Sequence, residues 1–250
     1  MNNKTTTSET ALDQGAFVKL HVAYIDILGF SQKYPTRNVD QKLMDFLKGL
    51  HSVLLLTNQN SNGSLACSNQ THNLMISDCI FLFRSEIGIL LEEIAEINFY
   101  SMLYLNLPTI AVIAYGEVFC DPRHDIYVGD PIIQAARAVE DKTIRSAGTY
   151  LPLELEKDCV STMGMKPFNK DYLRAEQMVY LFDRLSDTEQ KALSWQKKTL
   201  DTMILETIKY GRDHLDEGLF YLKYGPLMKE LKSVSNKLQQ DLADFLAENG

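Results

Sequence analysis

The chain has 250 residues, which is enough for one large domain or for a core domain with an appendage. Its net charge of −8 argues against a surface that coats nucleic acid, so we expect no nucleic-acid partner. No apolar run reaches the roughly 20 residues of a membrane span, and the 4 cysteines are scattered without a CxxC pair. We therefore expect a cytoplasmic protein with reduced thiols and no direct membrane insertion.

Hydrophobic periodicity predicts an alternation of strands and helices after a polar, flexible N-terminal tail at residues 1–16. The elements expected in chain order are a strand at Phe17–Leu28, a helix at Val39–Thr57, strands at Asn73–Ser77 and Cys79–Arg84, a helix at Glu86–Leu105, a strand at Thr109–Tyr115 that turns at Gly116, a short strand at Ile126–Val128 and a helix opened by Gly129-Asp130-Pro131. This β-α-β-β-α-β order is ferredoxin-like. It predicts an α+β fold with an antiparallel sheet and helices on one face.

The C-terminal part has a different pattern. Met178–Phe182 could form one last strand, and the capping box at Ser186–Glu189 precedes a helical stretch to about Gly211. Pro226–Glu248 predicts a further helix with one apolar stripe, and the two helices could pack on the core or on a second subunit. The expected organisation is a tail at 1–16, a core domain at 17–185 and a helical extension at 186–250.

Two carboxylates lie inside apolar runs. Asp26 is in HVAYIDILGFSQ and Asp78 is in LMISDCIFLF. A buried acid carries a desolvation cost of several kcal/mol or more unless a partner compensates it, and a bound cation is one such partner. The two positions together predict a pair of metal-holding aspartates, and therefore chemistry on phosphate.

Three segments resemble class III nucleotidyl cyclases, the family of adenylate and guanylate cyclases. They are YIDILGF around Asp26, MISDCIFLF around Asp78, and AYGEVFCDPRHDIYVGDPIIQAARAVE at Ala114–Glu140. The resemblance covers roughly residues 18–160 and identifies the core at 17–185 as a nucleotidyl cyclase domain. It implies that Asp26 and Asp78, with the backbone of Ile27, hold two divalent metal ions, Mn²⁺ or Mg²⁺.

The same resemblance assigns the remaining roles. The backbone of Gly29 and Phe30 would meet the triphosphate of a nucleoside triphosphate substrate. Arg137 would stabilise the charge that builds on the α-phosphate. Because the family's arginine comes from the partner subunit, the resemblance implies a homodimer with active sites at the interface.

The sequence also departs from the family pattern. Ile133 stands where the transition-state asparagine is expected, so the adjacent Gln134 either replaces it or that contact is absent. Leu74 and Ile126 stand at the two purine-reading positions, unless a shifted register places Asp125 at the second. Apolar side chains cannot hydrogen-bond a purine edge. The family's C-terminal phosphate-binding lysine motif is not found.

A cyclase core without purine readers is similar to the pyrimidine cyclases of bacterial Pycsar antiphage systems, which make cyclic UMP or cyclic CMP. UTP is favoured here, because Arg84 has the strand parity of Asp78 and could contact a uracil carbonyl, although it could equally close the strand at the surface. A separate cyclic-nucleotide-responsive effector protein is expected. The alternatives are a cytidylate cyclase, a conventional adenylate cyclase, and a nucleotide-binding sensor without catalysis.

Overall fold

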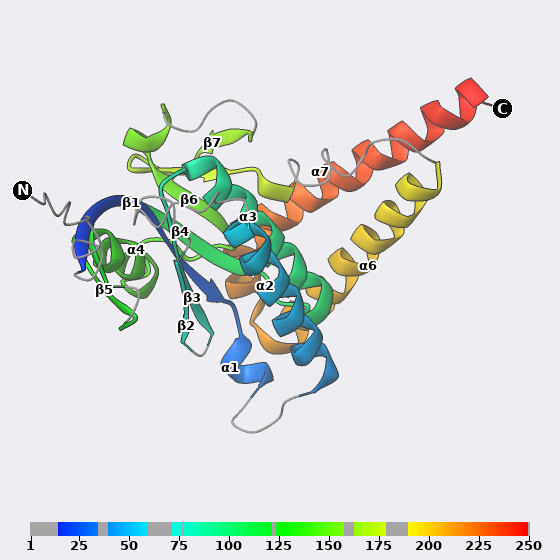
Figure 1. Ribbon diagram of the computed structural model, residues 1–250. Helices are drawn as coiled ribbons and strands as arrows, with labels where there is room; N and C mark the ends of the chain where they lie inside the picture. Colours follow the sequence, from blue (N-terminus) through cyan, green and yellow to red (C-terminus); the bar gives the residue numbers. More distant parts are fainter. Residues whose placement is uncertain are drawn as a thin grey trace, which may run out of the picture.

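The computed structural model describes residues 15–34, 40–59, 72–76, 78–121, 124–157, 163–178 and 190–249. Figure 1 shows a twisted sheet with helices packed on it and a long helical pair at the C-terminal end. The helices are α1 (Phe30–Lys33), α2 (Gln41–Gln59), α3 (Ile87–Tyr100) with its π-helical continuation η2 (Ser101–Leu105), α4 (Asp130–Glu140), the 3-10 turn η3 (Leu153–Leu155), α6 (Gln190–His214) and α7 (Glu217–Asn249). The strands are β1 (Ala16–Ile27), β2 (His72–Ile76), β3 (Cys79–Arg84), β4 (Thr109–Asp121), β5 (Ile126–Val128), β6 (Gly148–Pro152), β7 (Met165–Pro167) and β8 (Tyr172–Ala175).

Within the described ranges, the strands form one 8-stranded sheet in the order β2-β3-β1-β4-β6-β8-β7, and β5 pairs with β4. β1 is central, with antiparallel neighbours β3 and β4 on its two sides. The predicted α+β class and the order of the first elements are confirmed. Two features add to the prediction: β4 and β6 pair in parallel, and the strands β6 to β8 extend the sheet beyond the ferredoxin-like part.

Helices cover both faces of this sheet, so the expectation of helices on one face only is wrong. Successive side chains of a strand point to opposite faces, so β1 contributes to two cores. Ile25 packs with α2 and α3 in a fully buried cluster, whereas Tyr24 packs with Ala135 of α4 on the other face. Asp26 has the parity of Tyr24, which places it on the face of α4. The helices α6 and α7 pack on the same face, where Leu227 joins the cluster that contains Ile110 of β4.

The predicted turn at Gly116 is wrong, because β4 runs without interruption from Thr109 through Gly116 to Asp121, a strand of 13 residues. Glycine is needed there for close packing rather than for a turn. A Cβ atom added at Gly116 would lie 2.9 Å from the Pro131 Cγ atom, and one added at Gly129 would lie 2.6 Å from the Glu117 carbonyl oxygen. The two glycines therefore let the first turn of α4 sit directly on β4.

The C-terminal helices are longer than the sequence predicts. α7 begins at Glu217 instead of Pro226, because Asp216 accepts a hydrogen bond from the Leu219 amide at 2.8 Å and caps the helix. Pro226 lies inside it. The last strand of the described residues ends at Ala175, and Met178, where a strand was expected to begin, is not in a strand. Of the expected tail at 1–16, Ala16 is already part of β1, and residues 1–14 lie outside the described residues. Ser77, residues 179–182 and the capping box with the boundary at 185 also lie outside them.

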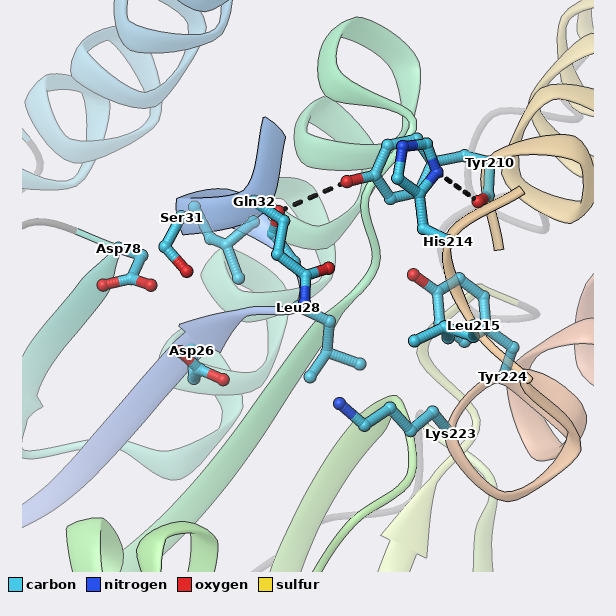
Figure 2. A pocket seen from close by; sticks show the side chains of 12 residues that line it. Asp26, Leu28, Ser31, Gln32, Asp78, Tyr210, His214, Leu215, Lys223 and Tyr224 are labelled. Atoms are coloured by element: carbon cyan, nitrogen blue, oxygen red, sulfur yellow. Dashed lines mark hydrogen bonds between the residues drawn. The ribbon is translucent and has the colours of Figure 1, made fainter. Parts of the chain in front are cut away.

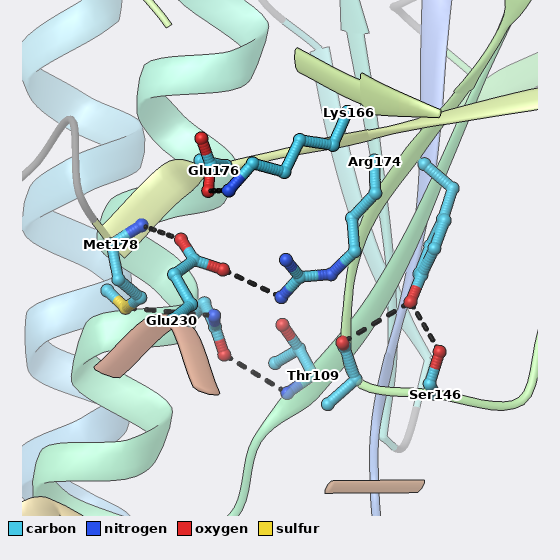
Figure 3. Close-up of polar contacts among 10 residues, drawn as sticks. Thr109, Ser146, Lys166, Arg174, Glu176, Met178 and Glu230 are labelled. Atoms are coloured by element: carbon cyan, nitrogen blue, oxygen red, sulfur yellow. Dashed lines mark hydrogen bonds and ion pairs between the residues drawn. The ribbon is translucent and has the colours of Figure 1, made fainter. Parts of the chain in front are cut away.

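A buried ion pair docks α7 on β8, the strand next to the edge of the sheet (Figure 3). Glu230 accepts a hydrogen bond from Arg174 of β8 at 2.7 Å and another from the Met178 amide at 2.7 Å. Glu230 is 6% exposed and Arg174 is 8% exposed. Since both charges are removed from water, each depends on the other, and the pair fixes α7 against the sheet.

Candidate functional site

Asp26 and Asp78 meet at one end of the sheet. Asp26 is the penultimate residue of β1 and is paired with Cys79, the first residue of β3. Asp78 lies in the turn just before Cys79, and its carbonyl oxygen accepts a hydrogen bond from the Ile27 amide at 3.2 Å. As a result, one ligand atom each of Asp26, Asp78 and Cys79 lies within 4.8 Å of the others. The structure thus brings together the two aspartates that the sequence singles out.

Burial and the neighbouring carboxylate perturb Asp26. Its pKa is raised from 3.8 to about 6, mainly because the side chain is buried; the negative charge of Asp78 contributes to this rise, and the positive charge of Lys223 opposes it. Burial also raises the pKa of the Cys79 thiol. The Tyr24 hydroxyl lies 3.0 Å from the Cys79 Sγ atom, and burial raises the pKa of Tyr24 as well. The group therefore consists of two acids that repel each other and a protonated thiol.

This donor set fits a hard divalent cation. Mg²⁺ and Mn²⁺ prefer carboxylate and carbonyl oxygens, and a cation between two carboxylates removes their repulsion. Asp26 and Asp78 supply the carboxylates, and Ile27 borders the same cavity. A protonated thiol is a poor ligand for these ions, so Cys79 is better placed to hydrogen-bond the site than to hold the metal.

The turn after β1 has a backbone conformation that lets another group approach the main chain closely. Gly29 adopts a φ angle of 81°, in the left-handed region that favours glycine, and it begins the short helix α1 at Phe30. Gly29 lines the cavity, whereas the Phe30 ring packs against Tyr34 with its centroid 5.2 Å away. The structure therefore places Gly29 at the site and turns the Phe30 side chain into the core.

The cavity beside the aspartates has a volume of about 210 Å³ and a second wall that the sequence did not predict. Figure 2 shows Lys223, Tyr224 and the stacked rings of Tyr210 and His214 facing Asp26 and Asp78. These residues come from the end of α6 and the start of α7. The sequence carries no local signal for these residues, because helical periodicity indicates only which face of a helix is buried.

Arg84 does not face this site, and the prediction that it contacts a base is wrong. It lies at the far end of β3, opposite His21 of β1. Its side chain is 2% exposed, and its Nε atom lies 2.7 Å from the Glu93 Oε2 atom. Its Nη2 atom donates a hydrogen bond to the Asn73 side chain at 2.8 Å. The Arg84 guanidinium is therefore paired within the fold, on the face of the sheet that α3 covers, and it stabilises the structure instead of contacting the cavity.

The two positions of the expected base readers are separated within one chain. Leu74 of β2 is paired with Phe81, which packs against Tyr24 on the Asp26 face, so Leu74 shares that face. Ile126 of β5 is 45% exposed and pairs with Asp121 at the opposite end of β4. A single subunit therefore does not bring Leu74 and Ile126 together.

The residues expected on α4 lie on its solvent side. Gln134 and Arg137 are exposed, and neither lines the cavity with Asp26. Ile133 beside them is 49% exposed, and Val128 just before the helix is 60% exposed. The described chain thus holds Arg137 on an exposed surface that also carries apolar side chains.

Comparisons with solved structures find adenylyl and guanylyl cyclases. A bacterial light-regulated adenylyl cyclase is 14% identical with a TM-score of 0.48, over 66% of this chain and 53% of that chain. The adenylyl cyclase CyaB from P. aeruginosa is 12% identical with a TM-score of 0.45, over 65% of this chain and 95% of that chain. The guanylyl cyclase Cya2 is 13% identical with a TM-score of 0.44, over 65% of this chain and 93% of that chain.

This chain therefore matches about half the length of the light-regulated enzyme. No family model and no curated protein matches the chain. Identities this low with TM-scores below 0.5 do not identify an activity. No helix among the described residues has the length and apolar character to cross a membrane.

Proposed function

We propose that this protein is a nucleotidyl cyclase, which converts a nucleoside triphosphate into a 3′,5′-cyclic nucleotide and pyrophosphate. The observation that carries the proposal is the convergence of Asp26 and Asp78, whose carboxylate atoms lie within 4.8 Å of each other at the ends of paired strands. The motif resemblance around both aspartates supports the same assignment.

In the proposed reaction, the ribose 3′-oxygen attacks the α-phosphorus, and the proton of its hydroxyl group passes to a water molecule. A bond forms between these two atoms, and the bond from the α-phosphorus to the bridging oxygen breaks, so that pyrophosphate leaves with that oxygen. Asp26, Asp78 and the Ile27 carbonyl would hold two divalent ions, which supply charge neutralisation for the triphosphate and acidify the hydroxyl. The left-handed turn at Gly29 lets the backbone approach the phosphates closely.

A homodimer with shared active sites is part of the proposal. Arg137 is exposed on α4 and does not line the cavity of its own subunit. The exposed apolar side chains of Ile126, Val128 and Ile133 lie close to it along the chain. Apolar side chains gathered on a surface are typical of a protein interface. In the dimer, Arg137 would reach the α-phosphate bound by the partner subunit, with Gln134 beside the ribose.

The proposed substrate is a pyrimidine nucleoside triphosphate. Leu74 and Ile126 offer no hydrogen bonds to a purine edge, which supports a smaller base. The reason for favouring UTP depended on Arg84, whose guanidinium is paired with Glu93. UTP and CTP are therefore equal candidates, and cyclic UMP or cyclic CMP would act as an antiphage signal read by a separate effector protein.

Chromatographic identification of the product tests the proposal directly. The purified full-length protein is incubated with each of the four nucleoside triphosphates and Mn²⁺. We expect a cyclic pyrimidine nucleotide, and we expect Asp26→Ala and Asp78→Ala to abolish it while Asp171→Asn, a change at an exposed turn, leaves it intact. Cyclic AMP or cyclic GMP as the main product would refute the pyrimidine assignment. Nucleotide binding without any cyclic product would favour the sensor alternative.

A further inference from the structure

The cavity beside the aspartates has walls of opposite charge. Asp26 and Asp78 form one wall, and Lys223 of α7 forms the other, with its ammonium group directed into the space between them (Figure 2). Among the described residues that line the cavity, Lys223 is the one lysine or arginine. A site for a metal ion alone requires the acidic wall only. The cationic wall gives the cavity a group that can pair with an anion beside a bound metal ion.

Lys223 is held at this place by the fold. Its carbonyl oxygen accepts a hydrogen bond from the Ala147 amide at 2.6 Å, in the segment that leads into β6. The Tyr210 hydroxyl donates a hydrogen bond to the Gly29 carbonyl oxygen at 3.4 Å, so the end of α6 contacts the turn that lines the cavity. A Cβ atom added at Gly211 would lie 2.4 Å from the Phe220 ring, so glycine lets α6 and α7 meet closely. Contacts on both sides thus position the lysine.

The size of the cavity limits the part of the substrate that it holds. Pockets that enclose whole organic ligands of moderate size have volumes of about 300–1,000 Å³. The cavity of about 210 Å³ is smaller than that and is lined mainly by polar groups close to the aspartates. A polyphosphate chain fits this description, because it is compact, highly charged and able to accept hydrogen bonds from an ammonium group while sharing oxygens with bound metal.

We propose that Lys223 binds the polyphosphate of the nucleoside triphosphate in the same subunit as Asp26 and Asp78. This inference depends on the proposed function and adds to it a binding residue outside the segments that carry the cyclase resemblance. The C-terminal helices then complete the catalytic site of their own chain. Lys223 orients the leaving pyrophosphate and balances its negative charge, whereas the base lies beyond the cavity.

Binding of inorganic tripolyphosphate to the full-length protein tests this role without turnover. Affinity is measured by titration calorimetry in a fixed excess of Mg²⁺, for the wild type and for Lys223→Met, Lys223→Arg and Lys229→Met. Lys229 is an exposed lysine of the same helix and serves as the matched control. A charge-assisted contact is worth a factor of about ten or more in affinity, so Lys223→Met should bind at least about tenfold more weakly. Lys223→Arg should retain most of the affinity, and Lys229→Met should retain all of it.

Mn²⁺ binding without phosphate provides the second readout, measured by electron paramagnetic resonance. Lys223→Met should bind Mn²⁺ as well as the wild type or more tightly, because a cation that repels the metal has been removed. Opposite effects on anion and metal cannot come from a damaged fold. Equal tripolyphosphate affinity in Lys223→Met and the wild type would overturn the inference, and so would a parallel loss of Mn²⁺ binding. If the wild type forms no cyclic product, the proposed function fails while these measurements still decide the role of Lys223.

Discussion

Replacing Asp26 by asparagine should stabilise the metal-free protein. Burial and the nearby Asp78 raise the pKa of Asp26 from 3.8 to about 6, so the folded state disfavours the charged carboxylate. A tenfold change in proton affinity corresponds to about 1.4 kcal/mol, so keeping Asp26 ionised in the folded state at neutral pH costs about 3 kcal/mol. The asparagine side chain has nearly the same shape without the charge. The free energy of unfolding should therefore rise by about 2–3 kcal/mol at pH 7.5.

The gain should depend on pH with a defined sign. Below 3.8, Asp26 is protonated in the folded and the unfolded protein, and substitution gains nothing. As the pH rises from 3.8 to about 6, the unfolded state ionises first, and the wild type loses stability that the variant keeps. Above about 6 the difference is complete. The variant and the wild type should thus converge near pH 4 and differ most above pH 6.5.

Urea unfolding at several pH values, with chelator present, measures this effect. Asp171→Asn is the control, because Asp171 is exposed and a similar substitution there should change stability by less than about 0.5 kcal/mol. Adding Mn²⁺ should stabilise the wild type and not the variant, since a ligand stabilises only the state that binds it. A variant that is less stable than the wild type at pH 7.5, or a difference that is independent of pH, would refute the argument.

Two further predictions concern the docking of α7 and the sharing of sites. Glu230→Gln should lower the free energy of unfolding by about 3–5 kcal/mol and speed hydrogen exchange in α7, because it leaves Arg174 buried without its counter-charge. Glu176→Gln is the control, because its partner Lys166 is 67% exposed, and it should cost less than about 1 kcal/mol. Mixed dimers of an Asp26→Ala subunit and an Arg137→Ala subunit should regain activity. One of their two sites then combines the intact Asp26 of one subunit with the intact Arg137 of the other. Failure to regain activity after verified subunit exchange would contradict a shared site.

The aspartate pair was predictable because its signal is local. An acid inside YIDILGF has no partner in its own strand, and a second acid in LMISDCIFLF needs only a strand pairing to meet it. That pairing follows from the short turn between β2 and β3 and from the central place of β1 in the sheet. Elements built from local periodicity, such as β1, α2 and α3, were likewise predictable within a few residues.

The role of Arg84 was mispredicted because strand parity was counted from a residue outside the strand. Asp78 lies in the turn, and β3 begins at Cys79. Counted from Cys79, which faces Asp26, Arg84 falls on the opposite face with Ile80 and Leu82. A residue in a turn does not follow the alternation of the strand after it, so its parity carries no information about the strand's faces.

The cationic wall could not be predicted from the sequence. Lys223 is separated from Asp26 by most of the chain, and the apolar stripe of α7 indicates only which face is buried. The contacts that bring the two together are specific pairings: Glu230 with Arg174, and the Tyr210 hydroxyl with the Gly29 carbonyl oxygen. Neither pairing has a periodic signature, since each depends on the packed positions of distant elements.

These contacts have a consequence for how the site forms. Asp26 lies on β1 and is placed by the pairing of β1 with β3, whereas Lys223 reaches the cavity only after α7 has docked on β8 and on the segment before β6. The acidic wall therefore exists without the cationic one, but a complete cavity requires residues from both the expected core at 17–185 and the expected extension at 186–250. A change that loosens α7 should leave metal binding intact and weaken polyphosphate binding, because metal and anion depend on different walls. Under the proposed function, docking of the C-terminal helices would therefore affect polyphosphate binding separately from metal binding.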